Sequence, residues 1–197
     1  MSSKHVLSEE SQLAILKSDA PPHEKAVACH KLVYVAGPKS VAPLAAMLND
    51  EILSDYARSG LEAIEDASAS QALIDALPKL KGRLLAGAVN SLGVRREGKA
   101  VGVLLTFSEK FTSGDDLAVG DAAVSSLGMI ASEPAVVVLK SLISRSFDSH
   151  RTAVGHASLM AVERLRSDGK AADAEELLDF LADAFPDGPI HDAAKRL

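Results

Sequence analysis

The chain of 197 residues carries a net charge of −6 at pH 7, and 47% of its residues are hydrophobic while only 4% are aromatic. The apolar side chains are mostly Ala, Leu and Val, so the composition favours closely packed helices, disfavours a β-sandwich or barrel, and excludes a disordered chain. The negative charge gives no overall attraction to nucleic acid or anionic membranes, and a single cysteine excludes an internal disulfide framework.

Two further features of the sequence bear on location. The first residues lack the long apolar segment of a secretory signal, and no apolar run approaches the roughly 20 residues that a membrane-spanning helix needs. A single cysteine also suits a reducing compartment. We therefore expect a cytoplasmic protein with no membrane partner.

The first predicted element is a short helix over residues 8–18. Ser8 supplies the N-cap, and Glu9 and Glu10 place negative charge in the first turn, where the helix dipole favours it. This helix is expected to cover the N-terminal end of the apolar core that follows.

Five later segments share one spacing of small and aliphatic residues. Each begins with Ala or Ser and carries Leu or Val four positions later, so both residues lie on one face of a helix. The segments cover residues 28–35, 57–64, 88–95, 123–130 and 158–165. Their first residues are 29, 31, 35 and 35 positions apart, which is the period of helix-pair repeats.

A break and a second apolar helix follow each of these segments. The breaks contain Gly past a helix end, Pro at the start of the next helix, and Asp or Ser as a cap. The second helices are predicted at 41–48, 72–77, 101–107, 136–143 and 174–185. Pro43 is expected in an early turn of its helix, and Pro78 should kink or end the helix before it. The last helix and tail are acidic, as suits a cap that faces solvent.

Helix pairs of this length cannot bury their apolar faces alone, so neighbouring pairs must stack into one core. We therefore predict an all-α fold, namely a right-handed α–α superhelix (solenoid) of about five helix pairs with a short N-terminal capping helix. The chain is expected to form a single domain over residues 1–197, with repeats at about 23–50, 51–81, 82–114, 115–147 and 148–185.

Three stretches in the second and third predicted repeats resemble a known family. Residues 53–64, 79–84 and 90–96 resemble HEAT repeats of the armadillo-like superfamily, and in particular HEAT arrays of bacterial proteins, many of which are uncharacterised. The resemblance spans roughly residues 23–185. It implies HEAT-like helix pairs, but the same solenoid occurs in scaffolds, inhibitors and a few enzymes, so it implies no single activity.

The dipeptide His23-Glu24 is the sharpest hint of a metal site. It resembles the His-Glu dipeptides with which deoxyhypusine hydroxylase, a helical-repeat enzyme, holds two irons. The chain has one such dipeptide, and His30 lies two helical turns further on, so the number of ligands disfavours a metal. An exposed His and Glu in a first helical turn is the simpler interpretation, and no cofactor is expected.

Other signals of catalysis are weak. Cys29 lies beside a small core residue, which favours a buried, inert thiol over an activated one. The scattered glycines form neither a phosphate-binding loop nor a nucleophile elbow. The sequence therefore gives no catalytic residues.

The most unusual charge pattern lies between residues 79 and 99. This segment contains six Lys and Arg residues and a single acid, which gives it a local charge of +5 in an acidic chain. Such turns are able to hold an acidic protein segment, a phosphate group or nucleic acid, although a solvated surface is the simpler interpretation. The absence of Trp and the net negative charge disfavour nucleic acid.

We expect a non-enzymatic scaffold or adaptor whose inner groove, lined by the second helix of each pair, holds another protein or a peptide. The candidate binding residues are Arg95, Arg96, Lys99, Lys110, Lys140 and Arg145. The alternatives are a metal-dependent enzyme of the helical-repeat hydroxylase type and nucleic-acid binding through the basic turns. A basic middle and an acidic C-terminal end also allow head-to-tail contact between copies.

Overall fold

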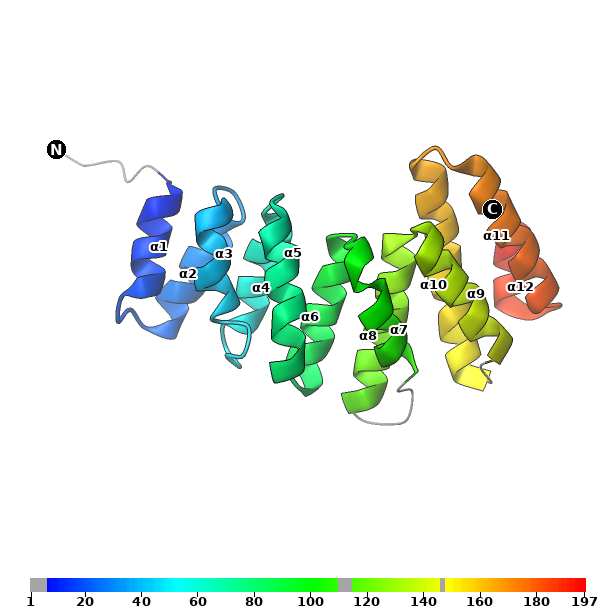
Figure 1. Cartoon of the computed structure of the whole chain (residues 1–197), viewed down its shortest axis with the longest axis horizontal. Helices are drawn as coiled ribbons and strands as arrows, with labels where there is room; N and C mark the ends of the chain where they lie inside the picture. The colour runs from blue at the N-terminus through cyan, green and yellow to red at the C-terminus, as the bar shows by residue number, and fades with distance from the viewer. Residues whose placement is uncertain (1–6, 110–114, 146–147) are drawn as a thin grey trace. The chain divides into compact units, whose positions relative to one another are not determined.

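The computed structural model describes residues 7–109, 115–145 and 148–197. Within these ranges the chain forms twelve α-helices and two short 3-10 turns and has no strand, which confirms the predicted all-α class (Figure 1). None of these helices combines the length and the apolar character needed to cross a lipid bilayer. The chain divides into two compact units, Met1–Ser91 and Leu92–Leu197, which are called unit 1 and unit 2 below.

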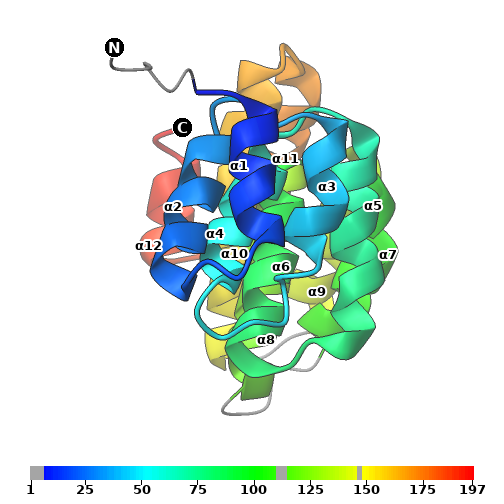
Figure 2. The ribbon, with the colours of Figure 1, turned by 90° about the vertical axis from the view of Figure 1, so that its left-hand side faces the viewer.

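Unit 1 begins with the predicted capping helix and continues with two helix pairs. Its elements are α1 (Glu9–Lys17), α2 (Pro22–Leu32), α3 (Pro38–Ala45), α4 (Ser54–Ala63), α5 (Ala67–Ala76), the 3-10 turn Leu77–Lys79 and most of α6 (Gly82–Val94). Helix α1 packs against α2 and α3, and Figure 2 shows it lying between them. It therefore covers the end of the first pair, as expected.

Unit 2 contains the end of α6 and the remaining helices. They are the 3-10 turn Gly98–Ala100, α7 (Val101–Ser108), α8 (Asp115–Ile130), α9 (Glu133–Arg145), α10 (Asp148–Ser167), α11 (Ala171–Ala184) and α12 (Gly188–Ala194). Helix α12 packs on α10 and α11. An acidic tail was expected at this position and the helix was not predicted, although Asp187 and Pro189 provide the N-terminal signals of one.

Local signals explain where several helices begin and end. The Ser8 side chain accepts a hydrogen bond from the backbone N–H of Ser11, and Asp66 accepts one from that of Ser68 at the start of α5. Helix α5 ends at Ala76 and Pro78 follows within the 3-10 turn, as predicted. Pro43 lies inside α3, in its second turn.

The predicted stripe of small and aliphatic residues forms the core. Its ten members have no exposed surface; they are Ala28, Leu32, Ala57, Leu61, Ala88, Leu92, Ala123, Leu127, Ser158 and Val162. Within each unit the helices lie in two layers, because α2 packs on α4 and α3 on α5, while α8 packs on α10 and α9 on α7 and α11. The small residues let the first helices of successive pairs approach closely.

Candidate binding groove

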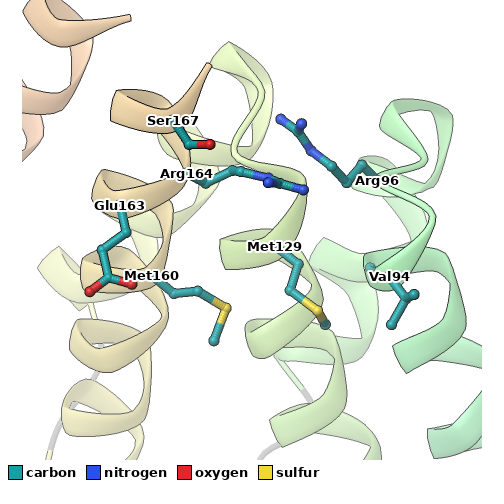
Figure 3. A pocket seen from close by; sticks show the side chains of 8 residues that line it. Val94, Arg96, Met129, Met160, Glu163, Arg164 and Ser167 are labelled. Carbon is teal, nitrogen blue, oxygen red and sulfur yellow. The ribbon is translucent and has the colours of Figure 1, made fainter. Parts of the chain in front are cut away.

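A groove opens in unit 2 where the C-terminal parts of α6, α8 and α10 lie side by side (Figure 3). Its volume is about 430 Å³. The lining residues are Gly93, Val94, Arg96, Met129, Met160, Glu163, Arg164 and Ser167. The groove thus lies on the first helix of each pair, whereas the second helices were expected to form the binding surface.

Two glycines set the spacing of the three helices. A Cβ atom on Gly93 of α6 would stand 2.7 Å from the Cα of Ser126 in α8, and one on Gly128 of α8 would stand 2.4 Å from the carbonyl oxygen of Ala157 in α10. Both distances are shorter than a Cβ atom can approach another atom, so any residue larger than glycine would force the helices apart. The close approach brings Met129 of α8 and Met160 of α10 into one groove.

The three helices end with a residue in the left-handed backbone conformation. These residues are Arg96 after α6, Ala131 after α8 and Gly169 after α10, with φ angles of 54°, 47° and 77°. The backbone N–H of Arg96 donates to the carbonyl oxygen of Gly93, and that of Glu97 donates to Leu92, which is a Schellman motif. Glycine is the usual residue at this position, so Arg96 holds a strained conformation beside the groove.

Arg96 is held by an ion pair with Asp168. Its Nη1 lies 3.1 Å from Oδ1 of Asp168, and its Nη2 donates to Oδ2 of the same carboxylate. The hydrogen bond from Arg96, followed by the charges of Arg96, Arg164 and Lys170, lowers the pKa of Asp168. The pair joins the end of α6 to the residue that follows α10 and forms one rim of the groove.

Arg164 is the cation inside the groove. Figure 3 shows its side chain reaching from α10 over the groove, with the guanidinium above Met129 in that view. Among the residues that the structure describes, its guanidinium has no hydrogen bond and no ion pair, and its charge acts on Asp168 only at longer range. An apolar floor beneath an uncommitted guanidinium is suited to a ligand with an apolar part and a carboxylate.

The predicted basic residues fall in different places. Arg96 lines the groove, whereas Lys140 pairs with Glu176 at 2.6 Å and lies 5.4 Å from the Phe180 ring centre. Arg145 pairs with Glu109 at 2.9 Å. Arg95 is partly buried and Lys99 is exposed, while Lys110 lies outside the described residues.

The basic segment 79–99 is also partly neutralised. Arg83 donates hydrogen bonds to Glu51 and Asp55. These bonds and the negative charges of the two acids raise the pKa of the Arg83 guanidinium. With Arg96 bound to Asp168, at least two of the six cations of the segment are committed to acids of the same chain. The local charge available to a ligand is therefore smaller than the sequence indicates.

Four lining residues of the groove were not among the predicted binding residues, namely Val94, Met129, Met160 and Arg164. The repeat contains the signal that would have found three of them, because Val94, Met129 and Arg164 each lie six positions after the first residue of a repeated segment. Met160 lies two positions after such a residue, and therefore one turn before Arg164 on the same helix face. These positions face away from the core.

The hypothetical metal site gains no support from geometry. The side chains of His23 and Glu24 are exposed, and Nε2 of His23 lies 4.0 Å from Oε1 of Glu24. Across ranges 7–109, 115–145 and 148–197, no three His, Cys, Asp or Glu side chains are grouped so that they could hold a metal ion. Cys29 is fully buried, and burial raises the pKa of its thiol to about 11, which keeps it protonated and unreactive at neutral pH.

No family model matches the chain, and no curated protein matches it significantly.

Proposed function

We propose that the chain is a non-enzymatic protein-interaction module whose groove in unit 2 binds a short amphipathic segment with an acidic side chain. The module is built from HEAT-like helix pairs stacked as a right-handed solenoid. The two-layered packing within each unit and the fully buried small-and-aliphatic stripe support this architecture. The observation that carries the binding proposal is the uncommitted Arg164 beside two methionines.

The floor of the groove is suited to an apolar anchor. Val94 and Met160 are 48% and 40% exposed, and Met129 lies in the groove with them. Methionine has several rotatable bonds and a polarisable sulfur, so methionine-lined grooves adapt to different aliphatic and aromatic side chains. An amphipathic helix places such anchors three or four residues apart on one face.

The acidic requirement follows from Arg164. A carboxylate that meets a guanidinium forms two parallel hydrogen bonds, which adds both affinity and orientation. Arg96 cannot play this role without losing Asp168, whereas Arg164 has no partner to give up within the described part of the chain. Glu163, next to Arg164 on α10, also lines the groove and would repel a second acid, so it favours one register of the bound segment.

The proposal is tested by selecting peptides from a displayed library of random helical sequences on the immobilised full chain. We expect the enriched peptides to share an acid next to apolar residues spaced three or four apart. The affinity of one such peptide, measured by fluorescence anisotropy, should fall about tenfold to a hundredfold with Arg164→Glu. Replacing the acid of the peptide by lysine should restore binding to Arg164→Glu.

Lys99→Glu is the matched control, because it reverses an exposed cation of the same unit outside the groove. Binding that survives Lys99→Glu and is lost with Arg164→Glu supports the groove. The opposite result would overturn it in favour of the second-helix surface that sequence analysis predicted. Absence of any enriched peptide would also overturn it.

A further inference from the structure

Unit 1 exposes apolar side chains along the outer face of α2. His23, Val27, His30 and Tyr34 follow one another at intervals of four, three and four residues, so they form one stripe of the helix and of the turn that continues it. The Val27 and Tyr34 side chains are 51% and 71% exposed. The opposite face, with Ala28, Cys29 and Leu32, is fully buried, so α2 is apolar on two sides.

The neighbouring helix α4 extends this surface. Ile52 precedes α4 and Tyr56 lies in its first turn, and their side chains are 63% and 44% exposed. A hollow of about 720 Å³ lies on this face, lined by Pro22, His23, Ala26, Val27, His30, Lys31, Ile52 and Tyr56. The rings of His30 and Tyr34 meet edge to face with 6.0 Å between their centres, which orders the end of the stripe.

We propose that this surface, called the α2 face below, is a two-fold symmetric interface at which two copies of the chain pair with their α2 helices antiparallel. The composition matches the buried centre of a protein interface, in which aromatic residues are enriched and charges are few. A two-fold contact uses the same patch on both copies, so it requires a patch that is complementary to itself.

The charges beside the stripe provide that complementarity. Glu24 and Lys31 are seven residues apart, so they lie two turns apart on the same flank of α2. When two such helices pack antiparallel about a two-fold axis near Val27 and His30, Glu24 of each copy lies opposite Lys31 of the other. A parallel arrangement would instead place like charges together, so the charges select the antiparallel one.

Both charges are available for this pairing. The Glu24 side chain is 56% exposed, and its Oε1 lies 4.0 Å from Nε2 of His23 in the same chain. Lys31 is exposed and, among the described residues, has no ion pair. Pairing would therefore form two new ion pairs, with only the 4.0 Å contact between His23 and Glu24 to give up, and would cover Val27 and Tyr34.

Sedimentation velocity of the full chain across a wide range of concentration tests the proposal. We expect the wild type to form a dimer, and Val27→Glu to raise the dimer dissociation constant about a hundredfold because it places a charge against apolar surface. Tyr34→Lys should act in the same direction, which guards against misfolding of one variant. Val137→Glu, at a 60% exposed valine of α9 in unit 2, is the control and should leave the dimer intact.

A charge exchange tests the orientation. Glu24→Lys alone should raise the dissociation constant about tenfold, and adding Lys31→Glu to it should restore the wild-type value. A wild type that stays monomeric at every concentration would overturn the proposal, as would a dimer that tolerates Val27→Glu. A dimer that is lost in the single charge variant and not regained in the double variant would overturn the antiparallel pairing. None of these variants touches the groove of unit 2, so peptide binding there is unaffected by the result.

Discussion

Gly128 of α8 and the carbonyl oxygen of Ala157 in α10 approach so closely that a Cβ atom on Gly128 would stand 2.4 Å away. We expect Gly128→Ala to lower the free energy of unfolding by about 1–3 kcal/mol or more, because the obstacle is backbone and the helices must separate. Gly102→Ala is the control, since nothing lies within 4 Å of its position in α7. Urea denaturation of both variants measures the difference, and equal stability would contradict the close contact.

The left-handed conformation of Arg96 gives a second prediction. Arg96→Ala and Arg96→Gly both remove the ion pair with Asp168, but only glycine adopts a φ of 54° without strain. We expect Arg96→Gly to be about 1 kcal/mol more stable than Arg96→Ala in the same denaturation experiment. A glycine variant that is no more stable than the alanine variant would show that the turn at the end of α6 carries no strain.

Arg151 of α10 joins the C-terminal ends of two neighbouring helices. Its Nη1 donates to the carbonyl oxygen of Ile143 in α9 at 3.1 Å, its Nη2 donates to that of Ala184 in α11 at 2.5 Å, and the guanidinium lies 5.0 Å from the Phe185 ring centre. Arg151→Met should lower the free energy of unfolding by about 2 kcal/mol.

Lysine should not replace Arg151, because an ammonium group lacks the planar fork that reaches both carbonyls. We therefore expect Arg151→Lys to be nearly as unstable as Arg151→Met in thermal unfolding followed by circular dichroism. Arg145→Lys keeps the charge of an exposed ion pair and should change stability by less than about 0.5 kcal/mol. Full recovery of stability in Arg151→Lys would show that charge alone matters.

The carboxylate of Glu9 makes the stability of unit 1 depend on pH. It accepts hydrogen bonds from the Ser40 hydroxyl at 2.7 Å and from the backbone N–H of Gly37 at 2.8 Å. Both bonds lower the pKa of Glu9 below its ordinary value of 4.5, and the bond from Ser40 has the larger effect. A carboxyl whose pKa is lower in the folded state stabilises the fold above its unfolded pKa. That contribution is lost as pH falls below 4.5 and through the folded-state pKa.

Glu9→Gln should therefore be less stable than the wild type at pH 7, and the difference should shrink as the pH is lowered below 4.5. Glu10→Gln removes the same charge from the same helical turn and serves as the control. Thermal unfolding of the three proteins at a series of pH values checks this. A difference between wild type and Glu9→Gln that stays constant with pH would contradict the role of the Glu9 carboxylate.

The helices and their buried faces were predictable because they depend on local spacing. The residues at positions such as Ala57 and Leu61 repeat with the period of a helix, and Pro78 marks a helix end by its own chemistry. Helix α12 was missed because it is short and follows an acidic stretch that was interpreted as a tail.

The groove was less predictable because its properties depend on partners that are far apart in the sequence. Arg96 and Asp168 are 72 residues apart, so the sequence does not reveal that the Arg96 guanidinium is bound to an acid of the same chain. Arg164 was not predicted as a binding residue, yet its guanidinium has no ion pair among the described residues and is open to a ligand. The outward positions of the repeat carry a recognisable pattern nevertheless. His23 and Ile52 occupy one equivalent position of two successive repeats, Val27 and Tyr56 another, and Tyr34 is equivalent to Met129.

The solitary, fully buried Cys29 makes the chain its own reporter of local opening. Because its thiol becomes accessible only when α2 leaves the core, the rate of alkylation in excess reagent measures the free energy of that opening under native conditions. Unit 2 contains no cysteine, so the alkylation signal belongs to unit 1 alone. Comparing it with global denaturation distinguishes one cooperative folding unit from two without introducing a label.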